Sequence, residues 1–314
     1  MSVPTPSPMP HALKLPAGLH VMERGWLSSN NILLVDAQQS VLIDSGYIAH
    51  APQTLSLLQN LLPHRSLDRL INTHLHSDHC GGNALLQATY GCQTLVPAAE
   101  LAAVQSWDQA RLSFADTGQR CEQFSADLAY QAGDSMQMAG LSWQVLAAPG
   151  HDPHSLIFYA PTEGLLISAD ALWGNGFGAI FGELQGTGGF AEQAAVLQLI
   201  SELDVRLVIP GHGAPFTDVA AALTRARDKL AYLAAEPKRN TRQIIRVLIA
   251  FLLLDERAIS ETALLQRYAN SSIMQAASEQ LNEPLAVLLK TATCELARLG
   301  VLEYGDGWLR QRAQ

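Results

Sequence analysis

Three histidines and an aspartate stand close together in the segment that runs from His74 through His76 and Asp78 to His79. His74 and His76 are two residues apart, so on an extended segment both rings project from the same side and can close on one cation. Asp78 and His79 follow where the segment would enter a helix, and adjacent side chains diverge there, which suits a second ion better. A histidine-rich surface turn is the alternative interpretation. We favour half of a two-metal site.

Three further side chains with metal-ligand chemistry each follow an apolar segment that we expect to be a strand. They are His151 after 141–146, Asp170 after 165–168 and His212 after 205–209. Functional side chains concentrate on loops that a rigid scaffold positions, so we expect these strand ends to meet the first cluster. A single histidine after Pro-Gly is more often a surface turn. This chain has two Pro-Gly-His turns as well as the cluster from His74 to His79, so a chance occurrence of all three is a poor explanation.

Periodicity and turn residues place these ligands among alternating strands and helices. Strands are expected at 19–23, 31–36, 40–44, 70–73, 94–96, 136–138, 141–146, 156–159, 165–168 and 205–209, and helices at 54–62, 83–90, 97–107 and 191–203. Residues 108–126 are expected to be irregular, and residues 1–18 to be a disordered or extended N-terminus.

Composition limits the possible classes of protein. Hydrophobic residues make up 48% of the 314 residues and charged residues 16%, which is typical of a globular chain with a large core and room for a second small domain. The net charge of −9 disfavours a partner bound mainly through phosphates. Four cysteines without a CxxC pair favour a reducing compartment, and because the first residues are proline-rich and no apolar run reaches membrane length, we expect neither a leader nor a membrane span. We therefore expect a cytoplasmic protein with no membrane partner.

The combined motifs resemble those of the metallo-β-lactamase-fold hydrolase superfamily, over about residues 19–235. The resemblance implies an α+β fold, an αββα sandwich with its site at one edge. It also implies the ligand sets. His74, His76 and His151 would hold one metal, Asp78, His79 and His212 the second, and Asp170 would bridge both.

The implied activity is that of a binuclear metal-dependent hydrolase acting on a small-molecule substrate. A hydroxide shared by two divalent ions would attack the carbonyl of an ester, thioester or lactone, and Asp78 would orient it or take its proton. Nitrogen and oxygen ligands suit zinc, our default, and also iron or manganese. The alternatives are a lactamase-like nuclease or phosphodiesterase, and a mononuclear iron persulfide dioxygenase. The presence of all three ligands for a second metal, Asp78, His79 and His212, argues against the dioxygenase, which uses a single iron.

Other residues are expected to support the site from behind the ligands. Asp44 resembles the family's strand-end aspartate that orders the metal-bearing loop, although a simple turn is an equal alternative. His154 and Ser155 stand where glyoxalase II has glycine and histidine, which weakens any transfer of its thioester substrate. We assign both to positions behind the ligands, with His154 also able to line the pocket.

The glycine-interrupted loop after Asp170 carries Trp173, Asn175 and Phe177, and we expect it to form a wall of the substrate pocket. The alternative is that its aromatic side chains pack into the core. An aromatic wall would favour an organic acyl substrate.

Composition changes near residues 236–240, and residues 241–314 read as a separate small domain. Expected helices at 241–254, 260–268 and 284–299 and a hairpin at 300–309 give a winged-helix-like order, which resembles a C-terminal module of lactamase-like hydrolases. Eight Lys and Arg residues are matched there by eight Asp and Glu residues. A nucleic-acid reader normally shows a basic face, so we expect a packing or dimerisation module instead.

Overall fold

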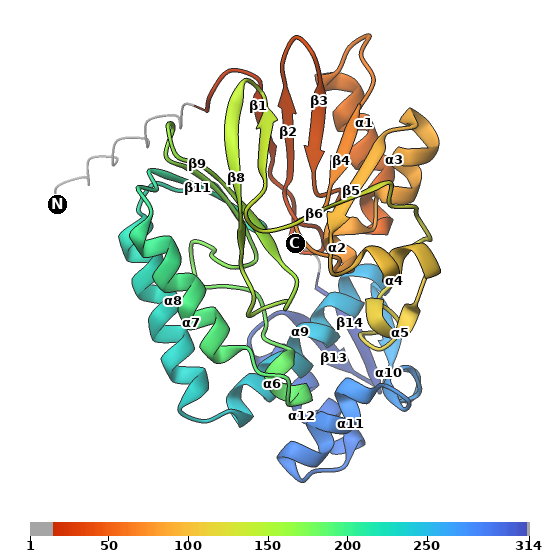
Figure 1. Cartoon of the computed structure of the whole chain (residues 1–314). Coiled ribbons are helices and arrows are strands. Elements are labelled where there is room, and N and C mark those ends of the chain that lie inside the picture. Colours follow the sequence, from red (N-terminus) through yellow and green to blue (C-terminus); the bar gives the residue numbers. More distant parts are fainter. Residues whose placement is uncertain (1–14, 313–314) are drawn as a thin grey trace, which may run out of the picture.

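The computed structural model describes residues 15–312, so most of the predicted N-terminal segment 1–18 lies outside the described residues. Two β-sheets pack face to face and carry helices on their outer faces, while a helical C-terminal unit lies across one edge of the sandwich (Figure 1). These layers confirm the predicted αββα sandwich.

The first sheet has six strands in sequence order. They are β1 (Leu19–Met22), β2 (Asn31–Val35), β3 (Ser40–Ile43), β4 (Arg69–Ile71), β5 (Gln93–Pro97) and β6 (Leu128–Tyr130). The first three pair antiparallel and the rest pair parallel. Helices α1 (Ala51–Leu61) and α3 (Asn83–Tyr90) cover the outer face, where Leu58 and Leu86 pack with Leu42 and Leu70.

The second sheet has five strands in the order β11-β10-β9-β8-β7. They are β7 (Ser135–Met138), β8 (Leu141–Ala147), β9 (Leu156–Ala160), β10 (Leu165–Ala169) and β11 (Leu207–Pro210), and only β10 and β11 pair parallel. Helices α7 (Phe190–Glu202) and α8 (Val219–Ala234) cover its outer face. Between the sheets, Ile43 and Ile71 of the first join Phe158 and Ile167 of the second in one buried core.

The C-terminal unit follows α8 after a short connection. It comprises α9 (Lys238–Glu256), β12 (Ala258–Ser260), α10 (Glu261–Tyr268), α11 (Ser272–Leu281), α12 (Leu285–Arg298), β13 (Leu302–Gly305) and β14 (Trp308–Gln311). Its strands form a three-stranded sheet in the order β12-β14-β13. The unit has a core of its own, which also includes Ala179 and Leu184 from the sandwich.

Short helices occupy several of the connections. They are the 3-10 helix η1 (Ile48–His50), α2 (Ser77–Cys80), α4 (Leu101–Ser106), α5 (Gln109–Leu112) and α6 (Gly182–Gln185). In the part of the chain that the structure describes, no helix combines the length and apolarity needed to cross a membrane.

Some elements differ from those expected. The helix predicted at 97–107 starts later, at Leu101, because Pro97 pairs with Tyr130 as the last residue of β5. The segment predicted to be irregular contains α5, whose N-terminus is capped by Asp108. Helices α8 and α11 and strands β6 and β12 were not expected from the sequence.

Candidate metal centre

The side chains of the centre come from the ends of four strands and from one short helix. His74 and His76 lie in the loop after β4, and α2 presents Asp78 and His79 directly afterwards. The other three follow β8, β10 and β11, as the sequence suggested. They are His151, Asp170 and His212.

Three histidine rings converge on one point of the centre. His76 Nδ1 lies 3.1 Å from His74 Nε2 and 2.7 Å from His151 Nε2. One ligand atom from each of these three residues lies within 4.8 Å of the others. This spacing is suited to three nitrogens around a single cation.

A second group lies beside the first. His212 Nε2 is 3.0 Å from Asp78 Oδ2, and His79 Nε2 is 3.9 Å from the same oxygen. Asp170 stands between the two groups, because its Oδ1 is 3.4 Å from His79 Nε2 and its Oδ2 is 3.4 Å from His151 Nε2. The structure therefore brings together all seven residues that the sequence singled out as ligands.

Hydrogen bonds behind the centre fix the orientation of two of the rings. His79 Nδ1 donates to Asp44 Oδ2 at 2.7 Å, and Asp44 also accepts from the Thr73 N–H and hydroxyl at 2.9 and 2.8 Å. His151 Nδ1 donates to the carbonyl of Ala179. Each of these bonds leaves Nε2 with its lone pair directed at the centre, which is the arrangement that metal-binding histidines adopt.

The donor set fits divalent cations. His79 Nε2 is buried without a hydrogen-bond partner and faces the carboxylates of Asp78 and Asp170. With Nδ1 donating to Asp44, the lone pair of Nε2 would point at carboxylate oxygens, which are also acceptors. Such an arrangement is costly unless a cation lies between the groups. Nitrogen and oxygen donors are those that zinc, iron and manganese accept.

Burial and charge act in opposite directions on these groups. Burial, reinforced by the neighbouring histidines, holds the pKa of His74 well below its usual range and lowers that of His151 to about 4. Burial also disfavours charge on His79, but the carboxylates of Asp44, Asp170 and Asp78 outweigh it and raise its pKa. His74 and His151 therefore favour the neutral imidazole, while the carboxylates of Asp78 and Asp170 supply the negative charge that complements a cation.

Close backbone approaches hold the centre in place. A Cβ at Gly211 would collide with Asp170 Oδ1, and one at Gly178 would collide with the ring of His151. Asp44 and Ala169, at the ends of their strands, have left-handed backbones with φ of 57° and 45°. Strained conformations of this kind persist only where the surrounding structure imposes them.

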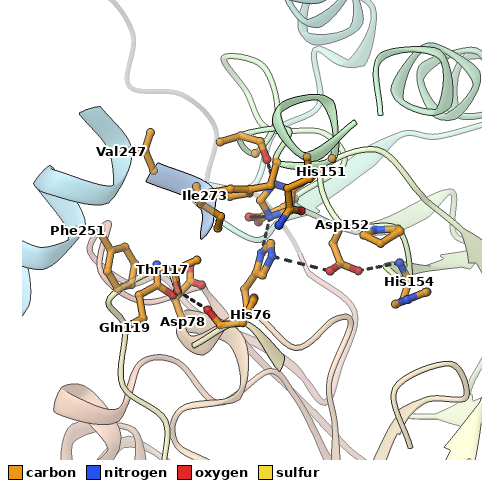
Figure 2. A pocket seen from close by; sticks show the side chains of 18 of the residues that line it. His76, Asp78, Thr117, Gln119, His151, Asp152, His154, Val247, Phe251 and Ile273 are labelled. Atoms are coloured by element: carbon orange, nitrogen blue, oxygen red, sulfur yellow. Dashed lines mark hydrogen bonds and ion pairs between the residues drawn. The ribbon is translucent and has the colours of Figure 1, made fainter. Parts of the chain in front are cut away.

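A cavity of about 280 Å³ opens onto the centre. Figure 2 shows Asp152 and His154 on one side of His76 and His151, and Val247 and Phe251 on the other. Helices α9 and α11 of the C-terminal unit thus close one side, with Val247 and Phe251 on α9 and Ile273 on α11. No motif in the sequence indicated these apolar contributions.

The predicted pocket loop divides between cavity and core. Trp173 lines the cavity, and its Nε1 donates to Asp170 Oδ1 at 3.2 Å. Phe177 is fully buried in the core below the second sheet, so the structure places it outside the wall where we expected it. Asn175 is exposed and is not among the lining residues. The Trp173–Gly176 bridge turns the loop back, which sends Phe177 inward.

His154 and Ser155, which we expected behind the ligands, take different positions. His154 lines the cavity and pairs with Glu100 at 3.3 Å, while Ser155 is buried. Burial and the nearby Asp152 raise the pKa of Glu100. Sequence reasoning missed Glu100, because a single acidic residue after a strand carries no recognisable signal.

Comparison with known proteins finds a family model and several relatives that match part of the chain. The family model described as "Metallo-beta-lactamase superfamily" matches residues 24–212. The chain is 31% identical over 115 residues to the hydroxyacylglutathione hydrolase of Rhodopseudomonas palustris strain HaA2, which covers 37% of this chain and 38% of that protein. A second hydroxyacylglutathione hydrolase, from Synechococcus sp. strain JA-3-3Ab, is 31% identical over 147 residues, 43% of this chain and 51% of the relative.

A relative with another activity matches similarly. The mitochondrial persulfide dioxygenase of Homo sapiens is 29% identical over 144 residues, which cover 46% of this chain and 47% of the relative. The chain thus spans about half or less of the length of these curated relatives.

A solved structure extends the likeness beyond the sandwich. A metallo-beta-lactamase family protein from Thermus thermophilus superposes with a TM-score of 0.57 at 20% identity, over 95% of this chain and all of the other. At this identity the comparison supports the fold alone.

Proposed function

Because this chain belongs to the metallo-beta-lactamase superfamily, we propose that it is a metal-dependent hydrolase acting at the carbonyl of an ester, thioester or lactone. One observation carries the proposal. Seven nitrogen and oxygen donors form two adjacent groups, with the two oxygens of Asp170 directed at different groups, beside a cavity. Two-metal hydrolytic sites have this arrangement.

The ligand roles follow from the two groups. His74, His76 and His151 would hold one ion, and Asp78, His79 and His212 the other. Asp170 would contribute to both. Divalent ions bound there would lower the pKa of a water molecule towards neutrality and polarise the carbonyl oxygen of the substrate.

The chain's own groups would handle the proton and the substrate. Asp78 lines the cavity, where its carboxylate is placed to accept a proton from the attacking water. Trp173 donates to Asp170 and holds that carboxylate in position. Val247, Phe251 and Ile273 exclude water from the side opposite His154.

The thioester class has specific support, since the first curated relatives are hydroxyacylglutathione hydrolases. The difference at His154 and Ser155 argues against copying their substrate. His154, paired with Glu100 at the cavity wall, occupies space that glycine would leave open.

A mononuclear iron dioxygenase is the second candidate, supported by the likeness to a persulfide dioxygenase. Such an enzyme, as the family resemblance implies, needs one iron held by two histidines and an aspartate. The second group of Asp78, His79 and His212 has no role in that chemistry, which is why we rank the hydrolase first.

Metal analysis together with a substrate screen tests the proposal. We expect close to two metal ions per chain and hydrolysis of at least one class among thioesters, lactones and simple esters. Asp170→Asn should lower turnover by more than about 100-fold, because even partners behind metal ligands are worth 10–100-fold. The matched control is Asp306→Asn, an exposed residue in the C-terminal hairpin turn that should retain activity.

Other results would redirect the assignment. A single iron with oxygen consumption on a persulfide would favour the dioxygenase. Cleavage of phosphodiesters or short RNAs without carbonyl hydrolysis would favour the nuclease.

A further inference from the structure

A second cavity, of about 610 Å³, lies beside the metal-site cavity. It is formed by α9, α12 and the segments at the base of the C-terminal hairpin. Its apolar lining includes Ala250, Leu253, Leu254, Leu296, Val301 and Leu302. Its volume falls within the range of cavities that hold small organic ligands.

The two cavities are neighbours. Trp26 and Val247 line both of them. Phe251 lies one turn after Val247 on α9, faces the metal-site cavity and meets the ring of Trp26 edge-on at 6.2 Å between centroids. Apolar side chains therefore form the boundary, and a flexible chain that crosses it stays in an apolar environment.

Polar groups are confined to a few positions of the second cavity. Gln243, Arg246, Gln311 and Arg312 line it. The guanidinium of Arg246 is already paired with Glu295 at 2.7 Å, and that of Arg312 donates to the Gly300 carbonyl at 3.3 Å. An anionic head group is thus better accommodated at the metal centre than here. The cavity suits a ligand portion that has no charge of its own.

We propose that the second cavity binds the linear alkyl chain of an acyl substrate whose carbonyl lies at the metal centre. The inference rests on the proposed function, and it narrows the substrate to esters, thioesters or lactones with an extended acyl chain. Each methylene that enters should strengthen binding about three- to fourfold until the cavity is filled.

Calorimetric titration of the purified metal-loaded protein with saturated fatty acids from butanoate to dodecanoate tests the proposal without turnover. We expect affinity to rise about three- to fourfold per methylene. Val301→Trp, which adds an indole at a half-exposed wall position, should remove most of that gain. Ala250→Phe should do the same from the other wall, and Val287→Trp is the control, since Val287 is exposed on α12 and lines neither cavity.

The titration distinguishes failure of the cavity proposal from failure of the proposed hydrolase function. Affinity that does not depend on chain length, or a length dependence that survives both wall variants, would overturn the proposal. A concentration-dependent dimer abolished by Val301→Trp, without length-dependent binding, would assign the surface to a second copy of the chain. Length-dependent binding in a protein that hydrolyses no carbonyl substrate would retain the cavity assignment and reject the hydrolase.

Discussion

At the scale of single residues, Asp44 shows how one side chain can organise a centre without facing its cavity. Its carboxylate is almost fully buried and accepts hydrogen bonds from His79, the Thr73 amide and the Thr73 hydroxyl. It therefore fixes both the ring of one candidate ligand and the loop that carries the others. The sequence suggested this role only through the strand-end motif, because the left-handed backbone that directs the carboxylate cannot be read from residue types.

We expect Asp44→Asn to weaken metal binding roughly 10- to 100-fold. Asparagine tolerates the left-handed backbone and keeps the volume, but it is uncharged and its amide can present a donor to Nδ1. Competition with a chelator, followed by metal analysis, measures the effect, with Asp306→Asn as the control. Unchanged metal retention would show that the orientation of His79 does not depend on the carboxylate.

Lys229 is a second residue near the centre whose position could not be predicted from a sequence motif. From α8 it reaches the loop after Asp170, where Nζ donates to the Phe177 carbonyl at 2.7 Å and lies 4.4 Å from the centre of that ring. Burial lowers the pKa of Lys229 to about 8 from an ordinary value of 10.5, although Asp170 acts in the opposite direction. Below about pH 8, Lys229 is charged in the folded protein, and the full free-energy cost of burying this charge lowers the stability of the fold.

This shift predicts a rise in stability at alkaline pH. Between about pH 8 and 10.5 the folded protein releases this proton while the unfolded chain keeps it, so the unfolded state binds more protons and the free energy of unfolding increases with pH. Relative to Lys229→Met, the wild type should gain on the order of 2 kcal/mol between pH 7.5 and 10. Urea unfolding of both proteins across this range measures the difference. Parallel pH profiles would contradict it.

At the scale of elements, the strands that deliver ligands could be predicted, because apolar runs ending in Pro-Gly or in an acidic residue are local signals. The strands β8, β10 and β11 were expected within two residues of their observed bounds. Elements without such signals were missed. Strand β6 has three residues of which only Tyr130 is buried, so it shows no apolar run.

Helix starts depend on contacts that are distant in sequence. Pro97 is favourable at the first turn of a helix, yet here it completes β5 because β6 is available to pair with it. In the sequence, Val247 and Phe251 likewise fit the pattern of an ordinary amphipathic helix, with nothing to distinguish them from core residues. Its place on the cavity wall depends on how the C-terminal unit docks, which local sequence does not encode.

At the scale of the whole molecule, polar contacts join the C-terminal unit to the sandwich. Asp255 on α9 accepts from the hydroxyl of Tyr47 at 2.9 Å and from Arg120 Nε at 2.8 Å. Asp116 accepts from the backbone and side chain of Ser272 at the start of α11. The loop that carries Arg120 and Asp116 also lines the cavity, so docking of the unit and the shape of the site are coupled.

These contacts lead us to expect that the two units unfold together, although we predicted a domain boundary near residues 236–240, a range that covers the end of the connection after α8 and the first residues of α9. Calorimetry of the full chain should give one transition with a calorimetric enthalpy close to the van't Hoff value. Loss of the Asp255 carboxylate leaves the buried Tyr47 hydroxyl and Arg120 without their acceptor, at a cost of roughly 1–3 kcal/mol.

Asp255→Ala combined with Asp116→Ala should therefore split the transition in two, because most core residues of each unit stay in place while these polar contacts across the joint are lost. Glu236→Ala, which removes only a surface pair with Arg239, should leave a single transition within about 0.5 kcal/mol of wild-type stability. Two transitions in the wild type would mean that the C-terminal unit docks weakly. The wall that it contributes to both cavities would then be formed only part of the time.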